Sequence, residues 1–444
     1  MDSPIFTFAK KYADSENVRM HMPGHKGTGP LGIEKYDLTE IDGADNLYSP
    51  DGIIGESEKC ASRIFGAYTY YSTEGSSLSI RAMLYLLSQY SKSKGEDVRI
   101  LAARNVHRSF ISGVSLLGIE PTWIEADGDS YLSVRLDAKA LDEKISAMDK
   151  PPHAVYITSP DYLGHMHNIR EIADTCHKFG SLLLVDNAHG AYLKFVSPCM
   201  HPIDLGADVC ADSAHKTLPA IGGAAYLHVS KSAPEIFREW AKDAMLLFGS
   251  TSPSYLILES LDLLNAYLQD GIKEDLKHAV ECADSMREKI SKMGFDVLYD
   301  EPLKLTVMPK SYGYTGEELA SILRNNGIYV EYYDPDYTVL MLSVRKYDGA
   351  DRVLRVLSEL ARKSPIKSIP PAIPHPVRKI SPREAVLSPK ERVLTSEALY
   401  RVASDVCISC PPAIPIVVSG EVIDENVIKA AEYYGIDRFT VTKG

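Results

Sequence analysis

The stretch SLLLVDNAHGAYL, residues 181–193, is the most informative about the fold. Its apolar half is as short as a buried strand, and that strand ends in a carboxylate, Asp186. A second apolar strand, ADVCA, is followed by the run Asp212-Ser213-Ala214-His215-Lys216. Strands of this kind, separated by helical segments, predict a mostly parallel sheet with helices on both faces. Such sheets bind ligands beyond the carboxyl ends of their strands, so Asp186 and Lys216 are candidates for one site.

The same alternation of helix and strand extends over the first half of the 444 residues. We predict helices at residues 77–90, 109–117, 138–148 and 169–179, and strands at residues 98–102, 121–124, 154–158, 182–185, 208–211 and 224–229. A long helical pattern then runs from about residue 253 to Met293, and short strands with one more helix follow it. The predicted fold class is therefore α/β, with smaller α+β domains toward the C-terminus.

Composition shifts give the expected domain boundaries. The Gly-, Pro- and Asp-rich beginning predicts a short helix followed by an irregular arm, and a segment with six prolines at residues 364–384 is typical of a linker or extended arm. The predicted parts are an N-terminal arm at 1–50, a large ligand-binding domain at 51–250, a small α+β domain at 251–365 and a C-terminal domain at 366–444.

Charge and cysteine usage narrow the classes of partner and compartment. The formal net charge is -12, and no stretch gathers Lys and Arg into a patch that would bind nucleic acid. The seven cysteines are scattered and odd in number, which fits a reducing compartment rather than a disulfide framework. The first residues lack the apolar core of a signal peptide, and no apolar run reaches the roughly 20 residues that span a bilayer. We expect a cytoplasmic protein that binds neither nucleic acid nor membrane.

A carboxylate and a lysine from neighbouring strand ends suit pyridoxal phosphate. The amine of Lys216 would condense with the cofactor aldehyde, and Asp186 would keep the pyridine nitrogen protonated. A phosphate needs backbone donors and hydroxyls at a helix N-terminus, and the run Thr73-Glu74-Gly75-Ser76-Ser77 supplies them directly before a predicted helix. Ser213 and His215 flank the lysine and can reach the same phosphate, and His107 is a candidate for stacking on the ring.

Each of these signals also has an ordinary structural explanation. An aspartate after a strand is most often a turn or cap residue, and a single lysine usually lies on the surface. The Gly-Ser-Ser run fits a plain helix cap, and His107 fits a loop histidine. The combination of Asp186 with the motif around Lys216 favours the cofactor.

Three further patterns are weaker. Residues 27–32 fit G-x-G-x-x-G but follow no predicted strand, so dinucleotide binding is not expected. Cys407 and Cys410 fit C-x-x-C without a second pair or a redox context. His165 with His167, or His21 with His25, lack the third and fourth ligands of a metal site, so no metal is predicted.

Taken together, the motifs resemble the ornithine/lysine/arginine decarboxylase family of fold-type-I pyridoxal-phosphate enzymes. The resembling stretches are MPGHKG, EGSSLSIRAM, RNVHRSFISG, TSPDYLG, VDNAHGAYL, SAHKTLPAIGG, SPREAV and PPAIPIVVSGE. They occur in family order from about residue 20 to residue 425, so the resemblance covers nearly the whole chain. It implies an aminotransferase-like large domain and a decarboxylase-type C-terminal domain.

The resemblance also implies roles for individual residues. Lys216 would be the Schiff-base lysine and Asp186 the partner of the pyridine nitrogen. His107 would stack on one face of the ring and Ala188 would pack on the other. The phosphate would be surrounded by the glycine loop and its neighbours, namely Gly75, Ser76, Ser77, Ser213 and His215. The stretch FGSTSPSY, with Thr251 and Ser252, is similar to the loop that such enzymes lend to the partner subunit, so a homodimer with shared active sites is implied.

Several positions differ from the sequence motifs that are usual in the family, which are Asp-Glu-Ala-His-Gly-Ala-His, Ser-Thr-His-Lys and a following Thr-Gln. This chain has different residues there and near its end, namely Asn187, Tyr192, Ala214, Gly222, Gly223, Asp405, Cys410 and Ala413. The expected reaction is α-decarboxylation of an amino acid, with a basic one expected as substrate, in which Lys216 or His215 returns the proton. The alternatives are an aminotransferase or lyase reaction with the same cofactor, and a non-catalytic homologue.

Overall fold

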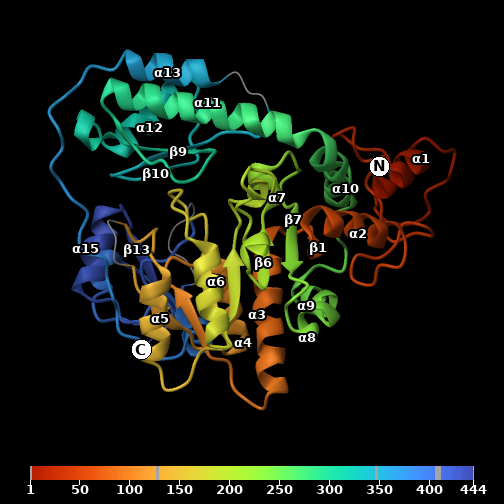
Figure 1. Cartoon of the computed structure of the whole chain (residues 1–444), viewed down its shortest axis with the longest axis horizontal. Helices are drawn as coiled ribbons and strands as arrows, with labels where there is room; N and C mark the ends of the chain where they lie inside the picture. The colour runs from red at the N-terminus through yellow and green to blue at the C-terminus, as the bar shows by residue number, and fades with distance from the viewer. Residues whose placement is uncertain (1–2, 127–129, 346–348, 406–411, 444) are drawn as a thin grey trace. The chain divides into compact units, whose positions relative to one another are not determined.

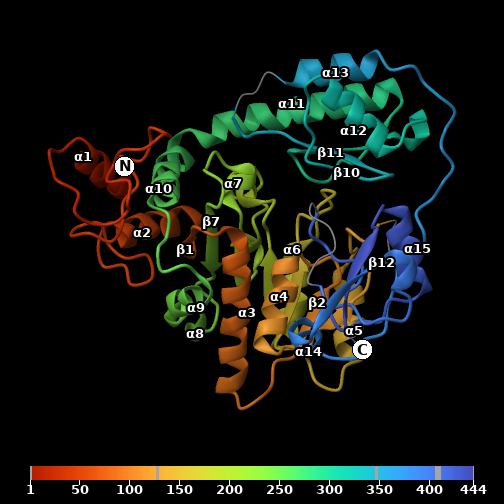
Figure 2. The same cartoon turned by 180° about the vertical axis from the view of Figure 1, so that it is seen from behind.

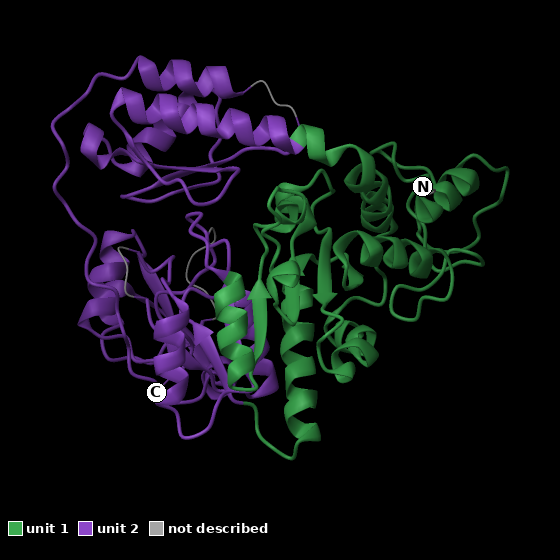
Figure 3. Ribbon diagram, in the orientation of Figure 1, with its two compact units in different colours: residues 1–98, 169–275 green, residues 99–168, 276–444 purple. Residues whose placement is uncertain are grey.

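The computed structural model describes residues 3–126, 130–345, 349–405 and 412–443. Its contacts divide the chain into two compact units, each made of two segments (Figure 3). The first unit comprises Met1–Val98 and Ile169–Asp275, and the second comprises Arg99–Asn168 and Leu276–Gly444.

The first unit holds four strands in the order β1-β7-β6-β5. These strands are β1 (Tyr68–Ser72), β5 (Leu182–Asp186), β6 (Val209–Asp212) and β7 (Ala225–Val229). β5 and β6 are parallel, whereas β7 runs antiparallel to both of its neighbours, β6 and β1. All residues of β5, β6 and β7 are buried, as expected of strands in the middle of a covered sheet.

Helices complete the first unit (Figure 1). They are α1 (Pro4–Ala13), α2 (Ile53–Phe65), α3 (Gly75–Ser93), α6 (Ile169–Lys178), α7 (Ala214–Thr217), α8 (Glu235–Glu239), α9 (Ala241–Phe248) and α10 (Tyr255–Asp270), with the 3-10 turns η1 (Ala191–Lys194) and η2 (Pro202–Leu205). α3 packs on β6 and β7 with one apolar face, and α6 packs on β5. α1, α2 and α10 lie against one another (Figure 1).

The described residues of the second unit contain three groups of paired strands. Its parallel strands follow the order β4-β2-β3, with β2 (Ile100–Ala103), β3 (Thr122–Ile124) and β4 (Ala154–Thr158). An antiparallel sheet has the order β10-β11-β9-β8, with β8 (Asp296–Val297), β9 (Lys304–Met308), β10 (Tyr332–Tyr333) and β11 (Thr338–Met341). β12 (Lys390–Leu394) and β13 (Arg438–Thr442) form an antiparallel pair.

The described helices of the second unit come from both of its chain segments (Figure 2). They are α4 (Arg108–Leu117), α5 (Ala138–Ser146), α11 (Ile272–Met293, which begins in the first unit), α12 (Gly316–Asn325), α13 (Ala350–Ser358), α14 (Pro382–Leu387) and α15 (Glu425–Tyr433), with the 3-10 turns η3 (Pro309–Tyr312) and η4 (Thr395–Glu397). Apolar residues of α11, α12, α13 and β9 form one core. A separate core joins α15 to the two C-terminal strands.

The predicted fold class, α/β with a mostly parallel sheet and smaller α+β parts, is confirmed. β4 has the predicted bounds, and the other predicted strands of the first half lie within two residues of theirs. The long helical pattern from about residue 253 to Met293 corresponds to two helices, α10 and α11, which Gly271 separates. Glycine lowers helix stability at that point, and a helical period in the sequence does not show such an interruption.

Candidate active site

Asp186 and Lys216 come from neighbouring strand ends of the first unit. β5 and β6 pair in parallel, with Asp186 opposite Ala211, so both strands end at the same edge. Asp186 is the last residue of β5, is 2% exposed, and accepts a hydrogen bond from the Ala188 N–H at 3.1 Å. Lys216 lies in α7, which begins directly after Ser213 at the end of β6. The parallel pairing thus brings together two residues that are thirty positions apart in the sequence.

His189 lies beside the lysine, although the sequence analysis did not select it. Its Nε2 is 3.2 Å from the Nζ of Lys216, and the histidine is 4% exposed. A neutral imidazole at this distance can accept a proton from the lysine ammonium. The signal that could have identified it is its place three residues after Asp186 in the same stretch.

The beginning of α3 has the features of a phosphate site. Gly75 opens this 19-residue helix with φ +67°, a left-handed conformation that favours glycine. Among the described residues, no side chain caps the helix. The Oγ of Ser213 donates to the Oγ of Ser76 at 2.8 Å, and the Gly75 N–H donates to the Gly223 carbonyl at 2.8 Å. A helix N-terminus with nearby hydroxyls suits an anion, so these residues and the partly buried Ser77 fit the phosphate of pyridoxal phosphate.

His215 is held at the same loop. Its Nδ1 lies 2.9 Å from the carbonyl of Ala224, and its own N–H donates to that carbonyl at 3.1 Å. A Cβ added to Gly75 would lie 3.8 Å from the Cε1 of His215, so the ring borders the glycine. Burial lowers the pKa of His215; the bond to Ala224 opposes this, and the neighbouring Lys216 adds to the lowering. The ring is then neutral at neutral pH with its proton on Nδ1, which leaves Nε2 as a hydrogen-bond acceptor.

Asp212 lies at the centre of a buried hydrogen-bond network that the sequence analysis did not foresee. Its carboxylate is fully buried, and it accepts from Nε2 of His201 at 3.0 Å and from Nε2 of His228 at 3.2 Å. The amide of Asn187 also donates to it, at 2.7 Å. Burial by itself would raise the pKa of Asp212, but the two histidines outweigh it and hold that pKa well below the ordinary value.

His201, Cys210 and Asp212 are also close enough to approach one metal ion. The two histidine nitrogens, however, sit at ordinary hydrogen-bond distances from one carboxylate oxygen. Thr69 Oγ1 lies 2.9 Å from the other ring nitrogen of His228, at hydrogen-bond distance. The described geometry is that of a hydrogen-bonded carboxylate.

The remaining predicted residues are His107, Ala188, Thr251 and Ser252. His107 belongs to the second unit, where it is the N-cap of α4 and its Nδ1 accepts from the Ser109 N–H at 3.2 Å. Ala188 is 7% exposed and follows the strand end of Asp186. Thr251 and Ser252 are exposed, and the neighbouring Ser250 N–H donates to the Glu74 carboxylate at 2.5 Å, which ties their loop to the residue before α3. The roles predicted for these residues stay predictions.

The weaker sequence patterns do not form a ligand or metal site among the described residues. Residues 27–32 lie in turns and bends, with no strand before them and no helix after them. His165 contacts the buried Asp161 through Nδ1 at 3.1 Å, in a cluster with Ser133. His25 pairs with Asp37 at 3.2 Å, and Cys407 and Cys410 lie outside the described residues.

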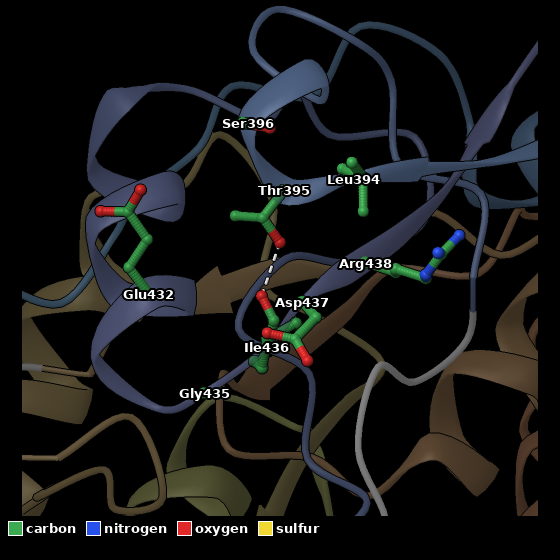
Figure 4. A pocket seen from close by; sticks show the side chains of 8 residues that line it. All are labelled: Leu394, Thr395, Ser396, Glu432, Gly435, Ile436, Asp437 and Arg438. Atoms are coloured by element: carbon green, nitrogen blue, oxygen red, sulfur yellow. Dashed lines mark hydrogen bonds between the residues drawn. The ribbon is translucent and has the colours of Figure 1, made fainter.

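A surface cavity of about 500 Å³ lies in the second unit (Figure 4). It is lined by residues of η4, α15 and β13 with the connecting turns, and the Thr395 hydroxyl donates to the Ile436 carbonyl across it. None of the candidate residues lines it. The cavity is open to solvent, and its lining residues are far in the sequence from those predicted to take part in catalysis, so we assign it no catalytic role.

Comparison with known proteins identifies the class of enzyme to which the chain is similar. Residues 3–301 match the family model of the Orn/Lys/Arg decarboxylase major domain. An arginine decarboxylase of Halalkalibacterium halodurans is 29% identical, over 96% of this chain and 91% of that protein. The solved lysine decarboxylase LdcF of Francisella novicida has a TM-score of 0.82 at 18% identity and covers 99% of this chain and 81% of that chain. A structure of SPT with pyridoxal phosphate has a TM-score of 0.56 at 14% identity and covers 81% of this chain and 83% of that chain.

The fold and the site therefore define a pyridoxal-phosphate enzyme of fold type I. The chain belongs to the Orn/Lys/Arg decarboxylase family, and it is a decarboxylase with pyridoxal phosphate as its cofactor. The resemblance seen in the sequence motifs is confirmed. No helix in the described part of the chain is long and apolar enough to cross a bilayer.

Proposed function

We propose that this enzyme decarboxylates a basic amino acid, with Lys216 as the amine that holds the cofactor. The observation that carries the proposal is the parallel pairing of β5 and β6, which delivers Asp186 and the Ser213–Lys216 turn to one edge beside the N-terminus of α3. The class of substrate rests on the relatives, which include an arginine decarboxylase.

The cofactor, when bound, supplies the electron sink that accepts the bonding electrons as CO₂ leaves. The chain's own residues bind and orient it. The hydroxyls of Ser76, Ser77 and Ser213 and the first N–H groups of α3 would hold the phosphate. The carboxylate of Asp186 would hold a proton on the pyridine nitrogen, and its burial strengthens that interaction. Ala188 and His107 would pack on the two faces of the ring.

Three side chains are available to handle protons. Lys216 must be neutral to act as a nucleophile, and the Nε2 of His189 at 3.2 Å can take its proton. His215 is kept neutral by burial and presents Nε2 as an acceptor. Lys216, or His215 once its Nε2 has taken up a proton, would deliver the proton that replaces the lost carboxylate at the substrate Cα.

A homodimer would complete the site. Thr251 and Ser252 are exposed in a loop anchored to Glu74, as a segment offered to a partner subunit would be. Apolar side chains on the preceding helices are exposed too, with Trp240 at 45% and Leu247 at 58%. Contiguous exposed apolar groups mark association surfaces, so these two side chains are candidates for a subunit contact. The five described cysteines form no disulfide with one another, which fits a reducing compartment such as the cytoplasm.

The proposal is tested by turnover. Purified protein loaded with pyridoxal phosphate is incubated with arginine, lysine and ornithine, and CO₂ and the amine product are measured. We expect release of CO₂ with an equal amount of amine from at least one of them, and loss of this release in Lys216→Ala. Formation of a keto acid in place of CO₂, or no turnover with all three amino acids, would contradict the proposal.

A further inference from the structure

The strand ends that carry Asp186 and Lys216 are joined by one buried side-chain hydrogen bond. Asn187, directly after Asp186, donates its Nδ2–H to Oδ1 of Asp212 at 2.7 Å. Asp212 ends β6 and lies four residues before Lys216. The backbone N–H of Asn187 donates to the Ala211 carbonyl at 3.0 Å, so the same residue is tied to β6 twice. Any shift of Asn187 moves the loop that places Asp186, Ala188 and His189.

Asp212 divides its hydrogen bonds between its two oxygens. Oδ2 accepts from Nε2 of His201 and Nε2 of His228, while Oδ1 accepts from Asn187 and from the Cys210 thiol at 3.4 Å. The carboxylate is fully buried, so each donor offsets part of the cost of removing its charge from water. An acceptor placed where Nδ2 of Asn187 sits would instead face a carboxylate oxygen at 2.7 Å.

The orientation of the Asn187 amide is fixed from the other side by packing. A Cβ on Gly190 would lie only 2.0 Å from Oδ1 of Asn187, so this oxygen is packed against the glycine. The Gly190 N–H also donates to the Asn187 carbonyl at 2.8 Å. With Oδ1 facing Gly190, Nδ2 must face Asp212.

We propose that Asn187 is a positioning residue for the cofactor site, and that an amide is required at position 187 because a carboxylate stands at position 212. The inference rests on the proposed function and deepens it. It explains the departure from the glutamate that the family usually has after the aspartate. A second carboxylate at 187 would face the buried charge of Asp212, and like charges at this distance cannot both remain ionised.

The test exchanges the acid and the amide. Three variants are compared with the wild type: Asn187→Asp, Asp212→Asn, and the double variant with both changes. In the double variant the carbonyl oxygen of the new asparagine can keep the two histidine donors, and its amide can donate to the new aspartate. Two quantities are measured from pH 6 to pH 8: the Kd for pyridoxal phosphate, by absorbance, and the unfolding temperature of the cofactor-free protein.

The proposal predicts that each single variant binds the cofactor about tenfold more weakly at pH 8, the effect of one lost buried hydrogen bond. The double variant should return to within about threefold of the wild type. For Asn187→Asp, the defect relative to wild type should shrink toward pH 6, because one carboxyl of the pair then holds a proton and can donate. The titratable groups around Asp212 are His201, His228, Cys210, Tyr226 and, on β5, Asp186, and all are retained in these variants.

Two results would overturn the proposal. One is an Asn187→Asp variant that binds the cofactor as tightly as wild type at every pH, and the other is a double variant no better than the single ones. Failure of the proposed function is seen separately. In that case the wild type itself does not bind pyridoxal phosphate. The effect of exchanging the acid and the amide is then measured by the unfolding temperatures of the cofactor-free proteins, which should fall in the single variants and recover in the double variant.

Discussion

The phosphate loop allows a quantitative prediction with a control on the same helix. Ser76 is 8% exposed, and its hydroxyl pairs with Ser213 at the uncapped beginning of α3. Ser79, one turn further along, is fully buried, and its Oγ has no hydrogen-bond partner within the described residues. Ser76→Ala therefore removes a hydroxyl at the phosphate site, whereas Ser79→Ala removes one that bonds to nothing described.

The expected magnitude follows from the type of bond. A hydrogen bond to a charged group contributes about 1.5–3 kcal/mol, so Ser76→Ala should raise the Kd for pyridoxal phosphate by about 10- to 150-fold. The cofactor-free protein loses only the neutral pair with Ser213, which costs about 1 kcal/mol of unfolding free energy. The assay is an absorbance titration of cofactor-free protein, with thermal unfolding measured in parallel. A Ser76→Ala variant with wild-type affinity, or a Ser79→Ala variant that loses as much, would refute this placement of the phosphate.

Two further predictions concern stability. Arg104 and Glu421 form an ion pair at 2.8 Å, and their side chains are 6% and 3% exposed, respectively. Arg104→Met should lower the unfolding free energy by about 3–5 kcal/mol, because it leaves Glu421 as an uncompensated buried charge. Arg378→Met, which breaks the exposed pair with Glu120, should cost less than about 1 kcal/mol in the same denaturant titration, and equal losses would contradict the reasoning. Burial, with Asp37 and Asp262 nearby, raises the pKa of Glu259 to about 8, so its proton stabilises the fold at low pH and this stabilisation is lost as pH rises toward 8. The unfolding temperature of the wild type should therefore fall as the pH rises toward 8, and Glu259→Gln should reduce this fall. Glu274→Gln, a change at an exposed site, should leave the pH dependence unchanged. Identical pH profiles for wild type and Glu259→Gln would contradict the prediction.

The sequence predicts those parts of the fold whose signal is local. β4 has the predicted bounds because Ala154–Thr158 is a continuous apolar run, buried at every position. β1 was not predicted, because its sequence YTYYS has no apolar run, and it becomes a strand by pairing antiparallel with β7 more than 150 residues later. α2, which begins at Ile53 after the predicted arm, was also not predicted.

The candidate site also combines residues with a local sequence signal and residues that only the fold brings together. Asp186, Lys216 and the glycine loop are visible in the sequence because each follows a strand or precedes a helix in a recognisable motif. The network around Asp212 could not be predicted, because His201 and His228 reach it from a turn and from another strand. Only the fold shows that Asn187, which looked like a departure from the family, is matched by a carboxylate at position 212.

The covalent bond between Lys216 and the cofactor can be tested directly. Protein incubated with pyridoxal phosphate is reduced with borohydride, digested, and analysed by mass spectrometry, after an absorbance spectrum has been recorded. We predict a band at about 420 nm before reduction, and a cofactor label on the peptide that contains Lys216 and on no other peptide. A colourless protein, or a label on a different lysine, would contradict the assignment of Lys216 as the Schiff-base lysine.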